Sequence, residues 1–392
     1  MVENKKTSDY GNRKELSRIP RSLSDLKNEN LFSDSTIGGA IMMDILIYCA
    51  NHKMKDLFGN IRFSVKDFCK RMGYNKANLQ RKLSPEQLRE IFGKEPPEYC
   101  VTISGHREYV HQIESIFEAM LYKLTKENLV LPVSQPNGTT RYTGINIVTY
   151  FEIADNFETK KRTKRMYTVS LSKEIQDLLY SNYNLIEIND YANVPDRKGY
   201  KRFYLILARM IFIIRYNIQK EKEASYSISI DQLALCFDIK ETEPKKKKSK
   251  VIDYLKRINK YLQNTRFKYT AVKGEGQKFA YTIKFEFEED VLSYFDEKYK
   301  AVFTSRFYTE LQNLYIKINL PETGVHQYHV IIKEIVADPI ENKKMINWIF
   351  SDKMINEKKA LHDKAFYQTY GKTPEEMDVK VDFKNEIINF IQ

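Results

Sequence analysis

The same order of predicted elements occurs twice along the chain, and this repetition constrains the fold more than any other feature of the sequence. In each copy an apolar helix precedes an alternating strand, a short helix, a longer amphipathic helix and two strands around a glycine-containing turn. The first copy opens with GGAIMMDILIYCANHK and the second with YKRFYLILARMIFIIRYNIQ. The repetition predicts two small domains with the same architecture.

The join between strand and short helix carries the same local signal in both copies. Ser64 stands three residues before Asp67, and Ser229 stands three residues before Gln232. At this spacing the serine and the acidic or amide side chain can each bond a backbone N–H of the other, which starts a helix. The full order is that of a winged helix-turn-helix. We therefore predict an α+β, mostly helical protein with tandem winged helix-turn-helix domains and a helical C-terminal appendage.

The changes in composition suggest four parts of the chain. The first 34 residues are polar and predict a flexible arm, whereas Asp338 followed by Pro339 predicts the start of a late helix, with a further helix ending at Gly371. The predicted parts are the N-terminal arm (1–34), winged-helix domain 1 (35–165), winged-helix domain 2 (166–290) and a helical extension (291–392).

The charge balance favours a polyanionic partner. The 392 residues carry a net charge of +12, which favours nucleic acid first and an anionic membrane surface second. The most apolar stretch, FYLILARMIFIIRY, contains Arg209 and ends near Arg215, so it is too charged to span a bilayer. The N-terminus lacks the apolar core of a signal peptide, so we expect a soluble, cytoplasmic protein without a membrane partner. Four scattered cysteines predict buried apolar side chains rather than a zinc site or a disulfide.

A run of lysines stands directly before an amphipathic helix in the second copy. Val251, Leu255, Ile258 and Leu262 form one apolar stripe at helical spacing. From residue 245 to residue 268 the chain has ten Lys and Arg against one acid, Asp253, a net charge of +9. The helix dipole disfavours cations at a helix N-terminus, but a phosphate bound there removes the conflict. DNA therefore explains the run better than folding does, although a flexible basic linker is an alternative.

The candidate DNA-binding residues of domain 2 lie on this helix and on the hairpin after it. In a winged helix the long helix enters the major groove and the hairpin tip contacts the flanking backbone. Arg257 is the side chain best suited to a bidentate contact with guanine. The candidates are Lys245, Lys246, Lys247, Lys248, Ser249, Lys250, Lys256, Arg257, Lys260, Arg266, Lys273 and Lys278.

Domain 1 has a different charge pattern. Its long helix, expected over residues 106–127, has three basic and four acidic residues and suits phosphate poorly. The positive charge lies downstream instead, and the candidates there are Lys160, Lys161, Arg162, Lys164 and Arg165. We therefore expect domain 2 to be the main DNA-binding domain. Domain 1 would contact the DNA backbone and form a dimer, because the alternating strand GINIVTYFEI offers an apolar edge.

The middle of the chain resembles a known family. A strand, a short helix capped by Ser172, a second strand around Leu185 and a helix rich in Tyr and Leu resemble the centre of the iteron-binding plasmid replication initiators, the Rep proteins with two winged-helix domains. The resemblance covers about residues 35–290 and is strongest over 166–287. It implies binding to repeated sites in double-stranded origin DNA, help in origin opening, recruitment of host replication proteins such as a helicase or host initiator, and autorepression by a homodimer with a monomer on origin DNA.

No motif in the sequence points to catalysis or to a cofactor. The chain has no G-x-x-x-x-G-K-[ST] loop. His326 and His329 are three residues apart, which would place them on opposite faces of a strand and not on one metal ion. We therefore predict a protein that is not an enzyme and needs no metal or cofactor. A transcriptional regulator without an origin role is the first alternative, and a replication or mobilisation nickase is the second.

Overall fold

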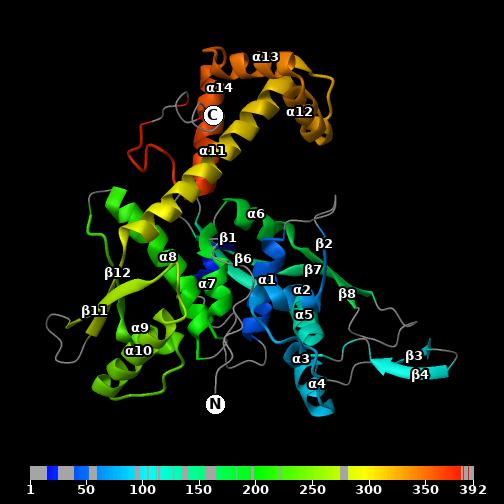
Figure 1. Ribbon diagram of the computed structural model, residues 1–392, viewed down its shortest axis with the longest axis vertical. Helices are drawn as coiled ribbons and strands as arrows, with labels where there is room; N and C mark the ends of the chain where they lie inside the picture. The colour runs from blue at the N-terminus through cyan, green and yellow to red at the C-terminus, as the bar shows by residue number, and fades with distance from the viewer. Residues whose placement is uncertain are drawn as a thin grey trace. The chain divides into compact units, whose positions relative to one another are not determined.

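Helices and small antiparallel sheets make up the chain, which gives the predicted α+β architecture with helix predominating (Figure 1). The computed structural model describes residues 16–24, 39–52, 60–92, 98–103, 106–111, 113, 115–126, 128–134, 140–154, 165–181, 183–195, 198–219, 222–273, 281–380, 383 and 387. The chain divides into two compact units. The N-terminal unit contains both copies of the repeated order, and the C-terminal unit begins at Glu289.

The first copy is built around the apolar helix α1 (Gly39–Ala50), which packs against α5 (Ile116–Lys126). Phe63, Phe68, Phe117 and Tyr167 meet in its aromatic core. The other elements are β2 (Ile61–Ser64), α2 (Val65–Met72), α3 (Lys76–Leu79), α4 (Pro85–Phe92), β3 (Glu98–Ile103), β4 (His106–His111), β5 (Asn128–Ser134), β6 (Thr140–Asn146), β7 (Val148–Ala154) and β8 (Met166–Leu171). Among them β3 pairs with β4, β5 pairs with β6, and β2, β8 and β7 form a three-stranded sheet.

The prediction of one long helix over residues 106–127 is wrong. Residues 106–111 form β4 and pair with β3, and the helix begins only at Ile116. A capping box starts it there, because the Ser115 hydroxyl accepts the Glu118 N–H and the Glu118 carboxylate accepts the Ser115 N–H. The strand β4 pairs with the strand just before it, and the predicted helix therefore extends too far toward the N-terminus.

The prediction of a flexible arm is wrong for residues 16–24. Here β1 (Leu16–Pro20) pairs antiparallel with β9 (Tyr183–Glu187) and continues into a 3₁₀ turn, η1 (Arg21–Ser24). Ile19 is fully buried, and the Asn51 side chain bonds the backbone N–H and C=O of Arg18. The pairing gives this polar segment a fixed backbone partner far along the chain, which local composition cannot reveal.

The second copy follows the predicted order closely. It contains α8 (Tyr200–Gln219), β10 (Tyr226–Ser229), α9 (Ile230–Cys236), α10 (Pro244–Asn259), β11 (Phe267–Lys273) and β12 (Tyr281–Phe287). Both predicted capping boxes are present, one at Ser64 and Asp67 and the other at Ser229 and Gln232. Between the two copies lie α6 (Lys173–Ser181), capped by the Ser172 hydroxyl, then β9 and α7 (Ile188–Asn193).

The two three-stranded sheets have equivalent orders. In the first, β2 pairs with β8 and β8 with β7, and in the second, β10 pairs with β12 and β12 with β11. By this order β7–β8 corresponds to β11–β12. Strand β8 therefore belongs to the first sheet, and the predicted boundary at residue 165 separates it from its partners. Alternation identified the strand but could not identify the strands with which it pairs.

The C-terminal unit is helical, as predicted for this part of the chain. It contains α11 (Glu289–Asn319), the 3₁₀ turn η5 (Val325–Gln327), α12 (Tyr328–Ala337), α13 (Pro339–Phe350) and α14 (Ile355–Tyr370). Asp338 caps α13 through bonds from the N–H groups of Ile340 and Glu341, and Gly371 ends α14 with a φ of 72°. Within the residues that the structure describes, no helix is long and apolar enough to cross a membrane.

Candidate nucleic-acid interface

Helix α10 presents one apolar face and one basic face. Val251, Leu255, Ile258 and Leu262 are fully buried, so the predicted stripe anchors the helix in the core of the second copy. The helix begins at Pro244, and its N-cap residue, Glu243, makes no side-chain hydrogen bond to the backbone. The first N–H groups of α10 are thus left without the side-chain acceptor that usually satisfies them.

Several cations of α10 have carboxylate partners within ion-pair distance. The ammonium of Lys247 lies 2.6 Å from Asp231 on α9, and that of Lys250 lies 2.9 Å from Glu241. Lys246 pairs with Glu243 one turn before it, and Arg257 pairs with Asp253 along the same helix. Such exposed pairs contribute about 0–1 kcal/mol each, so phosphate groups can replace the carboxylates at little cost.

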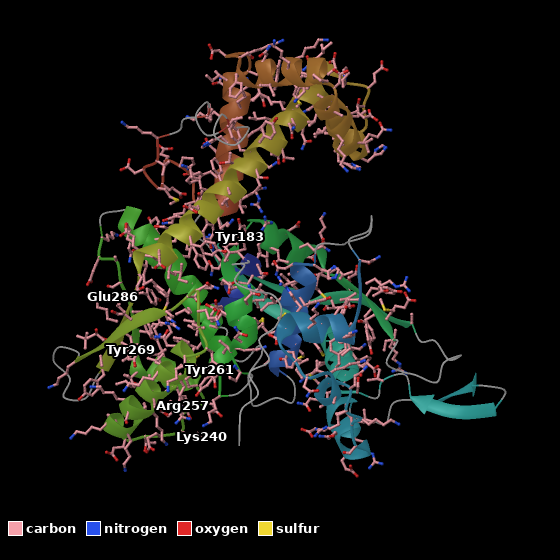
Figure 2. All side chains as sticks on the ribbon, viewed as in Figure 1. Tyr183, Lys240, Arg257, Tyr261, Tyr269 and Glu286 are labelled. Carbon is pink, nitrogen blue, oxygen red and sulfur yellow. The ribbon has the colours of Figure 1, made fainter. Side chains whose placement is uncertain are left out.

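Other cations of this surface have no such partner. Among the described residues, no carboxylate lies within 4.0 Å of five of these basic side chains. They are Lys245, Lys248, Lys256, Lys260 and Arg266. Except for the half-buried Lys248, all are exposed. We call these five side chains, together with Lys246, Lys247, Ser249, Lys250 and Arg257, the basic face; all lie on α10 except Lys260 and Arg266, which follow its end at Asn259. Arg257 is labelled on α10 in Figure 2.

The basic face continues toward the hairpin formed by β11 and β12. The ammonium of Lys248 lies 4.1 Å from the centre of the Tyr281 ring, which places the lysine run beside the first residue of β12. Lys273 is exposed at the end of β11, whereas Lys278 lies outside the described residues. Lys268, near the start of β11, pairs with Glu288. The lysine run thus lies beside the loop end of the hairpin, where Lys273 is opposite Tyr281.

The side chains available for base contacts are fewer than the sequence suggests. Arg257 and Ser249 are exposed, and the hydrogen bond and charge of Asp253 raise the pKa of Arg257. Asn259 is not available, because its side chain bonds both the N–H and the C=O of Phe267 at 3.2 and 3.0 Å. Arg257 is therefore the best-placed side chain of α10 for a bidentate contact with a base.

The basic segment of the first copy is only partly within the described residues. Lys160, Lys161, Arg162 and Lys164 lie outside them, in the connection between β7 and β8. Arg165 does not match the prediction of a phosphate contact. It is buried, and its guanidinium lies 2.6 Å from the Glu118 carboxylate, which also accepts the Tyr167 hydroxyl at 2.8 Å. The cations before it gave no sign that Arg165, the residue just before β8, would be buried.

A buried carboxylate that no local sequence pattern indicated binds the turn after α10. Asp190 on α7 accepts the backbone N–H groups of Gln263, Asn264 and Thr265 and the Thr265 hydroxyl, at 2.7–2.9 Å. The acidic residue lies inside a short helix in the sequence, where nothing distinguishes it from a solvent-exposed aspartate. Only tertiary structure brings it to the turn after α10.

His326 and His329, two of the three histidines of the C-terminal unit, lie in helical structure and not on a strand. His326 is in η5 and His329 is in α12, and both are exposed. Within the described part of the chain, no group of three or more His, Cys, Asp or Glu side chains is arranged to hold a metal ion. Cys49, Cys69 and Cys236 are buried, as predicted for these three.

Comparison with known proteins gives a likeness to solved structures but none to a family model or a curated sequence. No protein-family model matches the chain, and no curated protein matches its sequence significantly. Among solved structures, the chain is similar to a Pi initiator protein whose crystal structure is a complex with iteron DNA. The TM-score is 0.38 and the sequence identity is 12%, over 71% of this chain and 99% of the other.

Proposed function

We propose that this chain is a double-stranded DNA-binding protein with two winged-helix domains, and that α10 is its main DNA-binding helix. The observation that carries the proposal is the basic face of α10. It combines exposed cations that have no carboxylate partner among the described residues and a helix whose N-cap residue, Glu243, makes no side-chain hydrogen bond to the backbone. A solvated helix normally mixes charges of both signs, whereas a phosphate backbone explains both features together.

The contacts follow from the positions of the side chains. Helix α10 enters the major groove. There the guanidinium of Arg257 leaves the Asp253 carboxylate and bonds the edge of a guanine base, and the Ser249 hydroxyl bonds a neighbouring base. Lys245, Lys256 and Lys260 neutralise phosphates on either side of the groove. The hairpin reaches the flanking backbone with Lys273 and Lys278. The exposed ion pairs within the basic face keep its cations extended toward solvent until DNA replaces the carboxylates.

The first copy contributes a second, weaker contact. Its β7–β8 connection is equivalent to the β11–β12 hairpin by sheet order and contains Lys160, Lys161, Arg162 and Lys164. These residues bind the backbone of the same duplex. Arg165 has no part in this contact, because it holds the buried Glu118 carboxylate.

The biological role that we propose is the initiation of plasmid-type DNA replication. It is supported by the resemblance of residues 166–287 to the iteron-binding initiators. In this role the protein binds repeated origin sites, aids origin opening, recruits host replication proteins and represses its own promoter. Dimerisation through the first copy is part of the proposal, because β7 is an edge strand of its sheet and exposes Tyr150.

Footprinting of the full chain on the DNA upstream of its own gene tests this role. Protection of an array of direct repeats is expected of an initiator. Protection of a single palindrome would favour the transcriptional regulator instead. Incubation of supercoiled DNA from the same region with Mg²⁺ or Mn²⁺ tests the nickase alternative, and a relaxed, covalently protein-linked product would overturn the non-enzymatic proposal.

A further inference from the structure

Helix α7, only six residues long, bonds both copies of the repeated order. On one side, Asp190 accepts hydrogen bonds from the turn that follows α10. On the other side, the Tyr191 hydroxyl bonds the Asp44 carboxylate of α1, and the carbonyl oxygen of Ala192 faces Gly73 at the end of α2. Three consecutive residues thus contact the DNA-binding half and the first half of the N-terminal unit.

The carboxylate of Asp190 accepts four hydrogen bonds from three consecutive residues. The residue is 1% exposed. One oxygen accepts the Gln263 N–H at 2.8 Å, and the other accepts the N–H groups of Asn264 and Thr265 at 2.9 and 2.8 Å and the Thr265 hydroxyl at 2.7 Å. Successive backbone N–H groups that converge in this way form an anion nest. Among the described residues, no basic side chain lies within ion-pair distance of Asp190, and the donors to its carboxylate are backbone N–H groups and one hydroxyl.

The turn that binds Asp190 fixes two DNA-binding elements at once. It lies between the end of α10 at Asn259 and the start of β11 at Phe267. The Asn259 side chain bonds both the N–H and the C=O of Phe267. The Thr265 hydroxyl also bonds that of Tyr204 on α8, at 3.0 Å. Burial and the charges of Asp190 and Glu187 raise the pKa of Tyr204 well above its usual value, so its hydroxyl remains protonated. A shift of Asp190 would therefore move both the basic face and the hairpin.

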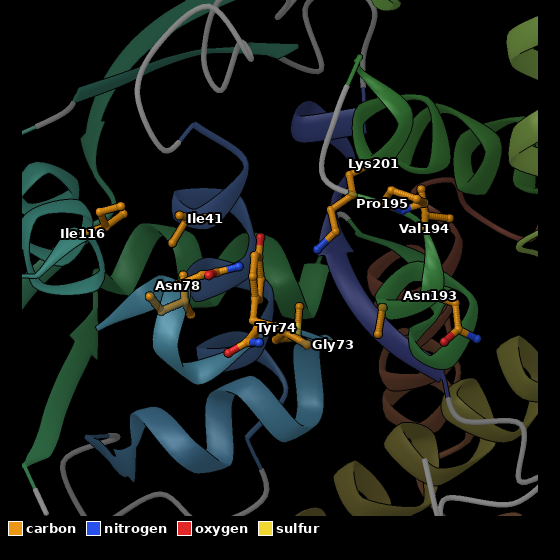
Figure 3. A pocket seen from close by; sticks show the side chains of 13 residues that line it. Ile41, Gly73, Tyr74, Asn78, Ile116, Asn193, Val194, Pro195 and Lys201 are labelled. Carbon is orange, nitrogen blue, oxygen red and sulfur yellow. The ribbon is translucent and has the colours of Figure 1, made fainter. Parts of the chain in front are cut away.

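The other side of α7 is equally constrained (Figure 3). Gly73 has a φ of 76°, and a Cβ there would lie 2.5 Å from the Ala192 carbonyl oxygen. The ammonium of Lys201 pairs with the buried carboxylate of Asp44 and lies 4.6 Å from the centre of the Tyr74 ring. A cavity of about 440 Å³ opens between these segments, but the contacts around it hold α7 to the first half.

We propose that Asp190 is a positioning residue that sets the distance and angle of α10 and the start of β11 relative to the core of the first copy. It thereby determines which spacing of contacted DNA segments the protein accepts. This inference rests on the proposed function and adds to it a determinant of specificity that does not touch DNA. One base-pair step advances the duplex by about 3.4 Å and rotates it by about 35°. A rigid connection between the two copies therefore fits only one number of base pairs between the DNA segments that they contact.

Asp190→Asn in the full chain tests the proposal. The amide cannot accept all four hydrogen bonds, and its NH₂ group faces donors. The probe is a duplex selected from random sequence by the wild-type protein, together with versions in which one base pair is inserted or deleted between the two footprinted segments. We expect the wild type to lose about 5- to 150-fold in affinity on either change, as is typical of coupled sites, and the variant to lose less than about threefold.

Two further variants keep the test decisive. Asp177→Asn makes the same chemical change at an exposed position on α6. It should retain the wild-type spacing penalty, that is, the loss of affinity when one base pair is inserted or deleted. If Asp190→Asn does not fold, Thr265→Val removes one of the four donors and should relax the penalty partially, while Thr265→Ser should restore it.

An unchanged spacing penalty in Asp190→Asn and Thr265→Val would overturn the inference, as would a wild-type protein that shows no spacing preference. Failure of the wild type to bind any duplex at 50 mM salt would instead overturn the proposed function.

Discussion

Replacing Lys245, Lys256 and Lys260 together by glutamine removes three exposed cations from the basic face without disturbing its core. None of the three has a carboxylate within 4.0 Å among the described residues, so no ion pair is broken. Glutamine has nearly the helix propensity of lysine, and the buried stripe of α10 is untouched. Any loss of binding therefore reports lost contacts with DNA and not a lost helix.

The expected size follows from counterion release. Each phosphate contact contributes a slope of about −0.9 to log K against log salt, so three lost contacts reduce the slope by about 2.7. At 150 mM salt the same three contacts correspond to roughly 100-fold in affinity. A wild-type protein with about six to ten contacts should lose roughly 10³- to 10⁵-fold between 50 and 200 mM salt.

Fluorescence anisotropy of a labelled duplex, titrated at four salt concentrations, measures both quantities. The control is the triple replacement of Lys333, Lys343 and Lys359, which are exposed in the C-terminal unit and change the net charge equally. The control should keep the wild-type slope. If both triple variants lost the same affinity, bulk charge would explain binding. A wild-type slope in the α10 variant would show that the lysine run does not contact phosphate.

Three further substitutions test separate parts of the structure. Arg257→Ala should lose discrimination at one base position by about 1–3 kcal/mol and bind other sequences nearly as before, which competition with single-base variants of the site measures. Gly199→Ala should unfold the second copy or lower its melting temperature strongly, since a Cβ there would lie 1.9 Å from the Cys236 carbonyl oxygen at a φ of 68°; an unchanged melting curve would contradict the close approach. Glu118→Gln should destabilise the first copy by about 3–5 kcal/mol in urea unfolding, because it breaks the buried ion pair with Arg165; a loss below about 1 kcal/mol would refute that dependence.

Local signals in the sequence predicted much of the second copy. The capping box at Ser229 and Gln232 and the apolar stripe from Val251 to Leu262 need only neighbouring residues, and both appear in the structure. The basic character of α10 follows from the same short segment. These features are predictable because a helix places side chains of known spacing on one face.

Features that depend on distant pairing could not be predicted. Strand β1 acquires its structure from β9, more than 160 residues away. Arg165 ends a run of cations in the sequence, yet in the structure it is buried in an ion pair with Glu118. Asp190 shows the same limit, because its role depends on a turn 73 residues later.

Hydrogen–deuterium exchange of the full chain, with and without the selected duplex, tests most directly whether α10 and its hairpin form the DNA-binding surface. We predict that DNA slows amide exchange in residues 243–260, including the first turn of α10, and in β11 and β12. Exchange in α12 and α13 should be unchanged. Protection confined to the C-terminal unit, with residues 243–260 unaffected, would contradict the account.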